Sequence, residues 1–358
     1  MCDFVKNGFL IYGCNGYTGK LISEHAAKLG LKPILAGRDA AKVESLAKEL
    51  SLPFRVFDLN EEQKVIQNIG DVKVVLHCAG PFKFTSKVMA AACIKAKTHY
   101  LDITGEFDVF ENLFAMGNEA KDAGVLLMPG VGFDVVPTDC LALYLKNKLA
   151  GAADTLELAL MMRGGRISHG TAITVAENLG ESGMVRRNGK LEKIPNGTLV
   201  REIKFEQGRK KKGVAIPWGD ISTAYRTTGI PNITIYNCLP DKVIASMKMS
   251  NRIGFILKWR PVKNFIINRI KKRPAGPSNE ERETSTSVVW GEVKNSFGAH
   301  VRAMLELPEG YTLTALTAVK IVQNILEKEP PHGTLTPATV FGADFILQFD
   351  KVKRIDLK

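Results

Sequence analysis

Three glycines spaced three residues apart, Gly13, Gly16 and Gly19, follow a short apolar segment and begin a stretch with helical periodicity. In a strand–turn–helix unit, the first glycine permits a sharp turn, the second lets the backbone approach a pyrophosphate, and the third lets helix and strand pack closely. The first helical turn also offers N–H groups and a positive dipole end to phosphate oxygens. We therefore predict dinucleotide binding through the residues of this loop, which are Gly13, Asn15, Gly16, Tyr17, Thr18 and Gly19.

The residues after the second and third apolar segments indicate which dinucleotide binds. The second segment ends in Gly37 and Arg38, and a guanidinium at this position suits the 2′-phosphate of NADP, where NAD-preferring enzymes usually carry a carboxylate. Asp39 follows at once and keeps NAD open as an alternative, although it could equally cap the next helix. Asp58 ends the third segment and either accepts from the adenine amino group or caps a helix. We favour NADP, used as NADPH.

The fourth apolar segment ends just before a short run of small residues. Ligands of an open α/β sheet bind outside the carboxyl ends of its strands. We therefore expect the nicotinamide to lie against the residues that follow this segment, which are Cys78, Ala79, Gly80 and Pro81.

Three carboxylates are candidates for catalysis. Asp102 lies at the end of the fifth apolar segment, and Glu106 lies in the loop that follows it. Asp134 follows a glycine-rich turn. Each could orient a cationic substrate, or donate a proton if burial raised its pKa. Asp102 could instead hold the next loop, and Glu106 could instead stabilise a helix N-terminus. No His or Cys cluster has metal-ligand spacing, so we expect no metal site.

These residues must be positioned by the elements around them. Through residues 1–130, short apolar segments alternate with helical stretches six times, which predicts a doubly wound parallel sheet, an α/β Rossmann domain. Residues 131–330 repeat strand-like segments, among them Ile221–Arg226, without regular intervening helices, which predicts an α+β domain with a mainly antiparallel sheet for substrate binding or dimerisation. A short helical segment, 331–358, ends the chain.

Six motifs of the sequence lie at 13–19, 36–38, 78–82, 100–106, 129–139 and 333–338. Together they resemble the saccharopine dehydrogenase-like oxidoreductases. Similarity is greatest to the branch that contains the trans-acting enoyl reductases of bacterial lipid synthesis and the animal saccharopine dehydrogenase-like protein. The resemblance implies a Rossmann domain, a second α/β domain, C-terminal helices that return to the first domain, and NADPH as the cofactor.

These motifs are compatible with three functions. The main hypothesis is an NADPH-dependent oxidoreductase that reduces an imine, or an enoyl or keto group, of a small lipid-like molecule by hydride transfer at a cleft between the domains. One alternative is a peripheral membrane or lipid-associated protein that keeps the nucleotide fold as a scaffold with little turnover. Another is a saccharopine reductase of lysine metabolism, which would need Arg163, Arg166 and Arg226 to converge on a diacid.

The net charge of +12 is concentrated in one quarter of the chain. Residues 185–275 hold 21 basic and 5 acidic side chains, and 251–273 hold eight basic and no acidic ones. In that last stretch Phe255, Trp259, Val262, Ile266 and Ile270 follow helical spacing, and Pro261 should kink or divide the helix. A basic amphipathic helix of this kind suits a membrane surface, but it could also pack on the second domain or in a homodimer. No recognised module for nucleic acid accompanies the charge, so we expect no nucleic-acid binding.

The amino terminus, the apolar runs and the cysteines predict a cytoplasmic protein. Membrane association of such a protein stays open. The amino terminus has no basic region followed by an apolar stretch, so we expect no signal peptide. Uncharged apolar runs stay short of the ~18 residues that a membrane-spanning helix needs. The six cysteines are scattered, which fits a reducing compartment.

Overall fold

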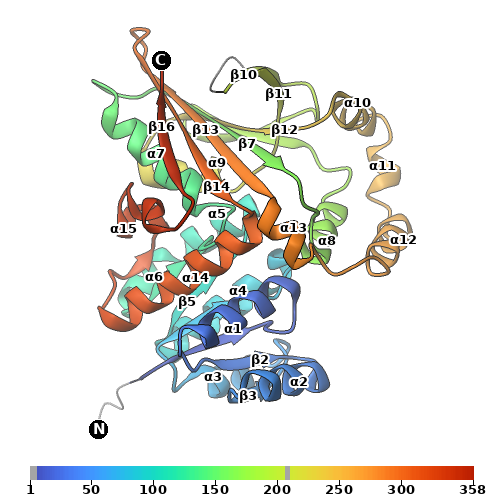
Figure 1. Ribbon diagram of the computed structural model, residues 1–358, viewed down its shortest axis with the longest axis vertical. Helices are drawn as coiled ribbons and strands as arrows, with labels where there is room; N and C mark the ends of the chain where they lie inside the picture. Colours follow the sequence, from blue (N-terminus) through green and yellow to red (C-terminus); the bar gives the residue numbers. More distant parts are fainter. Residues whose placement is uncertain (1–5, 206–209) are drawn as a thin grey trace. The chain divides into compact units, whose positions relative to one another are not determined.

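The computed structural model describes residues 6–205 and 210–358 (Figure 1). Residues 1–5, on which part of the signal-peptide expectation depends, lie outside the described part. The chain divides into two units by its internal contacts. Unit 1 comprises Met1–Val136 and Tyr311–Val340, and unit 2 comprises Pro137–Gly310 and Phe341–Lys358.

Unit 1 contains a seven-stranded sheet in which every strand pair is parallel, as the alternation of strand and helix predicts. Its order is β15-β6-β5-β4-β1-β2-β3, so the chain moves outward in opposite directions from β1. The gap between β1 and β4 is therefore the topological switch point, where ligands of such sheets bind. The strands are β1 (Phe9–Tyr12), β2 (Ile34–Gly37), β3 (Phe54–Val56), β4 (Val74–His77), β5 (His99–Asp102), β6 (Leu126–Met128) and β15 (Gly333–Thr334).

The register of the central strands sets the position of the site. Tyr12 at the end of β1 pairs with His77 at the end of β4, and His77 pairs with Asp102 at the end of β5. Three strands thus stop at the same level, because parallel pairing keeps their carboxyl ends at one edge. The helices of this unit are α1 (Tyr17–Lys28), α2 (Ala40–Leu50), α3 (Glu62–Ile69), α4 (Phe82–Ala96), α5 (Phe107–Ala115), α6 (Gly117–Asp122) and α14 (Gly310–Glu327).

Fully apolar strands explain why this sheet is covered on both faces. All four residues of β1 are buried, and so are those of β4. Leu10, Val75, Tyr100 and Leu127 belong to one core cluster. Such continuous apolar runs are typical of parallel strands with helices on each side.

Unit 2 contains a nine-stranded sheet that is antiparallel except between β7 and β12, which confirms the predicted mainly antiparallel second sheet. Its main path runs β10-β11-β12-β7-β13-β14-β16, while β8 pairs with β12 and β9. The strands are β7 (Thr155–Arg163), β8 (Gly183–Arg187), β9 (Lys190–Ile194), β10 (Val200–Lys204), β11 (Lys210–Ala215), β12 (Asn232–Cys238), β13 (Thr286–Lys294), β14 (His300–Pro308) and β16 (Lys353–Leu357).

The helices of unit 2 include one that the sequence analysis assigned wrongly. Ile221–Arg226 lies within α9 and not in a strand. β-Branched residues favoured a strand, but Ile221 and Ala224 are buried on one helical face, and Gly229 ends the helix with a φ of +72°. The helices are α7 (Val136–Lys148), α8 (His169–Glu177), α9 (Asp220–Thr228), α10 (Asp241–Ser250), α11 (Gly254–Leu257), α12 (Arg260–Ile270), α13 (Asn279–Thr284) and the 3₁₀ helix η2 (Phe345–Gln348).

The C-terminal segment is shared between the two units. β15 extends the parallel sheet beside β6, whereas β16 pairs antiparallel with β14 in unit 2. α15 (Pro337–Phe341) spans the change from one unit to the other. The sequence analysis had placed all of 331–358 on the first domain and 311–330 in the second. Among the described residues, no helix combines the length and apolarity required to cross a membrane.

Candidate cofactor and active site

The glycine turn packs directly against the end of β4. Gly13 has a φ of +85°, and a Cβ there would come within 2.8 Å of the Ala79 Cβ. A Cβ on Gly19 would overlap the Gly13 carbonyl oxygen. Gly16 caps α1, and no described side chain fills its cap position. The turn therefore leaves a bare backbone at a helix N-terminus, which fits a pyrophosphate.

The end of β2 lies beside this turn. The Gly13 N–H donates to the Ala36 carbonyl at 2.8 Å. A Cβ on Gly37 would lie 3.0 Å from Asn15 Oδ1, so only glycine lets the two loops approach so closely. The cofactor-binding residues predicted after β1 and after β2 thus lie side by side in the structure.

Arg38 and Asp39 have separate surroundings. Asp39 caps α2, accepting from the Lys42 N–H at 3.2 Å and pairing with Lys42 Nζ at 2.9 Å. These bonds lower the pKa of its carboxyl. Arg38 is exposed just after β2 and takes part in no ion pair with the described residues. A cap role thus accounts for Asp39, and Arg38 is left as the charged group suited to a phosphate.

Asp58 is exposed beyond β3, and its Oδ1 accepts from the Asn60 N–H at 2.9 Å in a tight turn. It also lies near Tyr12, whose pKa is raised to about 12 by burial first, with Asp58 adding to the rise and Arg38 opposing it. Arg38 and Asp58 therefore flank the same tyrosine. A contact of Asp58 with adenine stays a prediction.

The segment after β4 lines the switch point. The Cys78 N–H donates to the Tyr12 carbonyl at 2.7 Å, which joins this segment to β1. Ala79 and Pro81 are half-buried and Gly80 is exposed, so their surfaces are accessible to a ligand. Burial raises the pKa of the Cys78 thiol far above its usual value. A protonated thiol of this kind lines a site without reacting.

Asp102 is fully buried, and both of its carboxyl oxygens have donors. Oδ2 accepts from the Tyr100 hydroxyl at 2.7 Å, while Oδ1 accepts from the Thr104 N–H at 3.0 Å and the Gly130 N–H at 2.9 Å. Burial raises its pKa to about 6, and the three hydrogen bonds oppose that rise. With its acceptors engaged in this way, Asp102 holds the loop after β5 to the loop after β6.

Glu106 differs from Asp102 because one of its two carboxyl oxygens has no hydrogen-bond partner among the described residues. Oε1 accepts from the Phe82 N–H at the start of α4, at 2.8 Å. Oε2 is buried and has no hydrogen-bond partner among the described residues. Burial is the main cause that raises the pKa of Glu106 to about 7. The side chain thus lies beside the Gly80–Pro81 segment with one unsatisfied oxygen.

Asp134 lies next to Glu106. The backbone of Gly105 packs on it so closely that a Cβ there would come 2.6 Å from Asp134 Oδ2. Burial, and secondly the charge of Glu106, raise the pKa of Asp134 to about 7. The structure therefore brings two of the three candidate carboxylates together as a pair that disfavours double ionisation.

Sequence reasoning missed the residues of α14 that hold this region. Thr314 Oγ1 accepts from the Phe133 N–H at 3.0 Å, and the Thr317 hydroxyl donates to the Val131 carbonyl at 2.8 Å. Tyr311 meets Tyr17 edge to face, with ring centroids 5.1 Å apart. These partners are about 180 or more residues apart in sequence, and no local pattern marks them.

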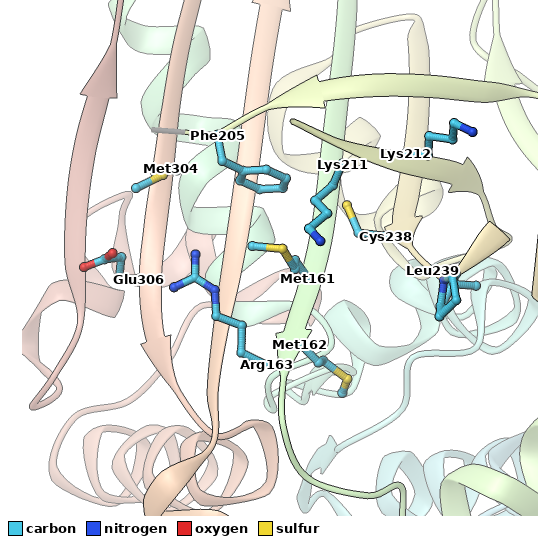
Figure 2. A pocket seen from close by; sticks show the side chains of 11 residues that line it. Met161, Met162, Arg163, Phe205, Lys211, Lys212, Cys238, Leu239, Met304 and Glu306 are labelled. Atoms are coloured by element: carbon cyan, nitrogen blue, oxygen red, sulfur yellow. The ribbon is translucent and has the colours of Figure 1, made fainter. Parts of the chain in front are cut away.

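A second candidate site is a pocket of about 660 Å³ within unit 2 (Figure 2). Arg163 on β7 and Lys211 on β11 point toward the space beside Phe205 and Met161 (Figure 2). Neither cation pairs with a carboxylate in the described part of the chain. The lining residues are Met161, Met162, Arg163, Phe205, Lys211, Lys212, Cys238, Leu239, Pro240, Met304 and Glu306.

The arginines expected to converge on a diacid have different neighbours. Arg163 lines the pocket just described. Arg166 pairs with Glu281 in α13 at 2.8 Å, and Arg226 lies in the last turn of α9. Only the first of the three lines this pocket.

Comparisons with known proteins agree with the geometry of unit 1. Residues 9–128 match the family model for the saccharopine dehydrogenase NADP binding domain. A human saccharopine dehydrogenase-like oxidoreductase is 27% identical over 249 residues, which cover 61% of this chain and 58% of the human protein. A trans-acting enoyl reductase of Mycobacterium tuberculosis is 29% identical over 164 residues, or 43% of this chain and 39% of that protein.

A solved structure extends the similarity of fold to the whole chain. The apo saccharopine dehydrogenase (L-Glu forming) of Saccharomyces cerevisiae superposes with a TM-score of 0.66, covering 98% of this chain and 100% of the yeast chain at 14% identity. The chain spans less than two thirds of the curated relatives that it matches. Residues 9–128 are thus similar to the saccharopine dehydrogenase NADP binding domain, and the chain as a whole shares the fold of the yeast saccharopine dehydrogenase.

Proposed function

We propose that this chain is an NADPH-dependent reductase in which Glu106 and Asp134 deliver a proton at the carboxyl edge of the parallel sheet. The observation that carries the proposal is the buried, unpartnered Oε2 of Glu106 beside a second carboxyl group of raised pKa. Perturbed carboxyl groups at a ligand-binding edge are typical of catalytic acids.

The cofactor, when bound, supplies a hydride to an electrophilic carbon of the substrate. The bare turn around Gly13 holds the pyrophosphate, and Arg38 binds the 2′-phosphate. Ala79 and Gly80 form the surface against which the nicotinamide is positioned. These residues bind and orient, and they carry out no proton transfer themselves.

The proton comes from the carboxyl pair. Because two neighbouring carboxyl groups with pKa values of about 7 resist joint ionisation, the pair retains a proton near neutral pH. Reduction of a C=C or C=O bond needs one hydride and one proton, and the proton passes from Glu106 to the substrate atom next to the reduced carbon. The Phe82 N–H then stabilises the carboxylate that remains.

We propose a mostly apolar substrate with an imine, enoyl or keto group and an acidic end. The pocket in unit 2 combines methionine, phenylalanine and leucine side chains with the cations Arg163 and Lys211, which suits such an amphipathic anion. The name of the mycobacterial relative points in the same direction. A diacid substrate such as saccharopine is less favoured, because Arg166 is engaged by Glu281 and does not line the pocket.

The test is NADPH oxidation by the purified chain against a panel of cyclic imines, enoyl thioesters and 3-keto thioesters. We expect turnover with at least one class. Glu106→Gln should lower kcat about 10²- to 10⁴-fold, the usual contribution of a positioned general acid, while NADPH affinity is kept. Equal kcat for the wild type and Glu106→Gln would refute the role of Glu106. Silence with every class, despite tight NADPH binding, would favour a scaffold with little turnover.

A further inference from the structure

Helices α10, α11 and α12 follow one another along one edge of unit 2 (Figure 1). Phe255 on α11, Trp259 at the N-cap of α12 and Phe265 on α12 are 76%, 63% and 61% exposed, although rings of this size are usually well buried. The exposed apolar side chains, which together form the α10–α12 surface, are Val243, Met249, Ile253, Phe255, Ile256, Trp259 and Phe265.

This arrangement corrects the helical face expected from the sequence. The stretch is two helices, α11 and α12, divided as expected at Pro261, which occupies the first turn of the second one. Phe255 and Trp259 are therefore exposed and do not share a buried face with Ile270.

α12 packs on α8 through a different face from the one that carries the exposed rings. Ile267 and Ile270 are buried in a cluster with residues of α8. Arg260 pairs with Glu177 at 2.8 Å, and Lys263 Nζ donates to the Glu177 carbonyl. The contacts that hold α12 on α8 thus do not involve the exposed rings. This weakens the interpretation that the rings serve packing within unit 2.

The same helices carry an excess of positive charge. Residues 241–273 contain ten Lys or Arg residues, and Asp241 is their one acidic residue. Lys248, Arg252 and Lys272 form no ion pair with any part of the chain that the structure describes. A partner for this surface must therefore accept aromatic rings and offer negative charge.

A groove of about 380 Å³ between α8 and α12 adjoins the surface. Its walls are apolar, with Val175, Leu179 and Ile266 among them, and Arg269 and Arg273 also line it. The Arg269 guanidinium lies 5.2 Å from the centre of the Phe265 ring. Guanidinium groups at an apolar groove match a phosphate group attached to an acyl chain.

We propose that the α10–α12 surface docks on an anionic lipid bilayer. Aromatic rings of amphipathic segments settle at the boundary between headgroups and acyl chains, and Lys and Arg extend to the headgroup phosphates. Contact with the same surface of a second copy would bring like charges together, which charge complementarity disfavours. The docking does not depend on the reaction proposed above.

The test is co-sedimentation of the full chain with vesicles, followed by tryptophan fluorescence. We expect binding to phosphatidylcholine–phosphatidylglycerol vesicles at low salt, release near 1 M salt, where the Debye length falls to about 3 Å, and little binding to phosphatidylcholine alone. Trp259 emission should shift to the blue on binding, and Trp259→Phe should remove the shift, because Trp290 is already buried and Trp218 is half-buried outside α10, α11 and α12.

Substitutions separate the two contributions. Removing the rings in Phe255→Ala/Trp259→Ala should weaken vesicle binding at least about tenfold. Phe297→Ala is the matched control, because Phe297 is 93% exposed on the β13–β14 turn of the same unit. Arg252→Gln/Lys272→Gln should reduce both the binding and its salt dependence.

Two results would overturn the proposal. The first is equal binding to neutral and anionic vesicles, or to neither. The second is a concentration-dependent dimer in lipid-free sedimentation equilibrium that Phe255→Ala/Trp259→Ala abolishes, since the surface would then belong to a second copy of the chain.

Discussion

Asp134 gives the most direct measure of the carboxyl pair. Its pKa is raised from 3.8 to about 7, so ionisation opposes the folded state. A raised carboxyl pKa gives stability that is complete below the unfolded pKa and is lost as pH rises through the folded value. For an isolated group with these values, the lost stability is about 2 kcal/mol at pH 5 and about 4 kcal/mol at pH 8. Asp134→Asn removes that penalty.

The assay is urea unfolding of the wild type and Asp134→Asn at pH 5 and pH 8. We expect the variant to gain about 2–3 kcal/mol relative to the wild type between the two pH values, and less where Glu106 shares the titration. Asp122→Asn, on an exposed position at the end of α6, is the control and should show no such change. An Asp134→Asn effect that is the same at pH 5 and pH 8 would refute the raised pKa.

The remaining predictions concern the cofactor and the sheet of unit 2. Arg38→Glu should weaken NADPH binding about 10- to 100-fold and change NADH binding little, measured by nucleotide fluorescence titration; an equal loss for both nucleotides would exclude Arg38 as the phosphate ligand. Glu292 is fully buried among Arg201, Lys294 and Arg302, and these partners overcome the effect of burial and lower its pKa to about 2. Glu292→Ala should therefore lower the free energy of unfolding by about 3–5 kcal/mol at pH 7, and a loss below 1 kcal/mol would contradict a strong network.

The parallel sheet and its strand ends could be predicted because their signals are local. The glycines of the 13–19 loop and the apolar runs of β1 and β4 lie within short stretches, and parallel pairing then aligns the strand ends. The roles of Thr314 and Thr317 could not be predicted, since their hydrogen bonds to the loop after β6 connect residues about 180 positions apart. The division of the helix at Pro261 could also be predicted, since proline interrupts a helix, whereas the choice between an exposed and a packed aromatic face could not, because it depends on contacts with α8.

The sequence could name three candidate carboxylates, but it could not rank them. Asp102 and Glu106 are both buried, yet Asp102 has three donors and Glu106 keeps one oxygen without any in the described structure. In unit 2, Glu292 is buried as well, and surrounding cations hold it ionised. Burial alone thus does not identify a proton donor. The distinguishing property is an incomplete set of partners at a ligand-binding edge, because only such a carboxyl group keeps a proton near neutral pH and has an oxygen free to pass it on. That criterion selects Glu106, whose charge in turn raises the pKa of the neighbouring Asp134.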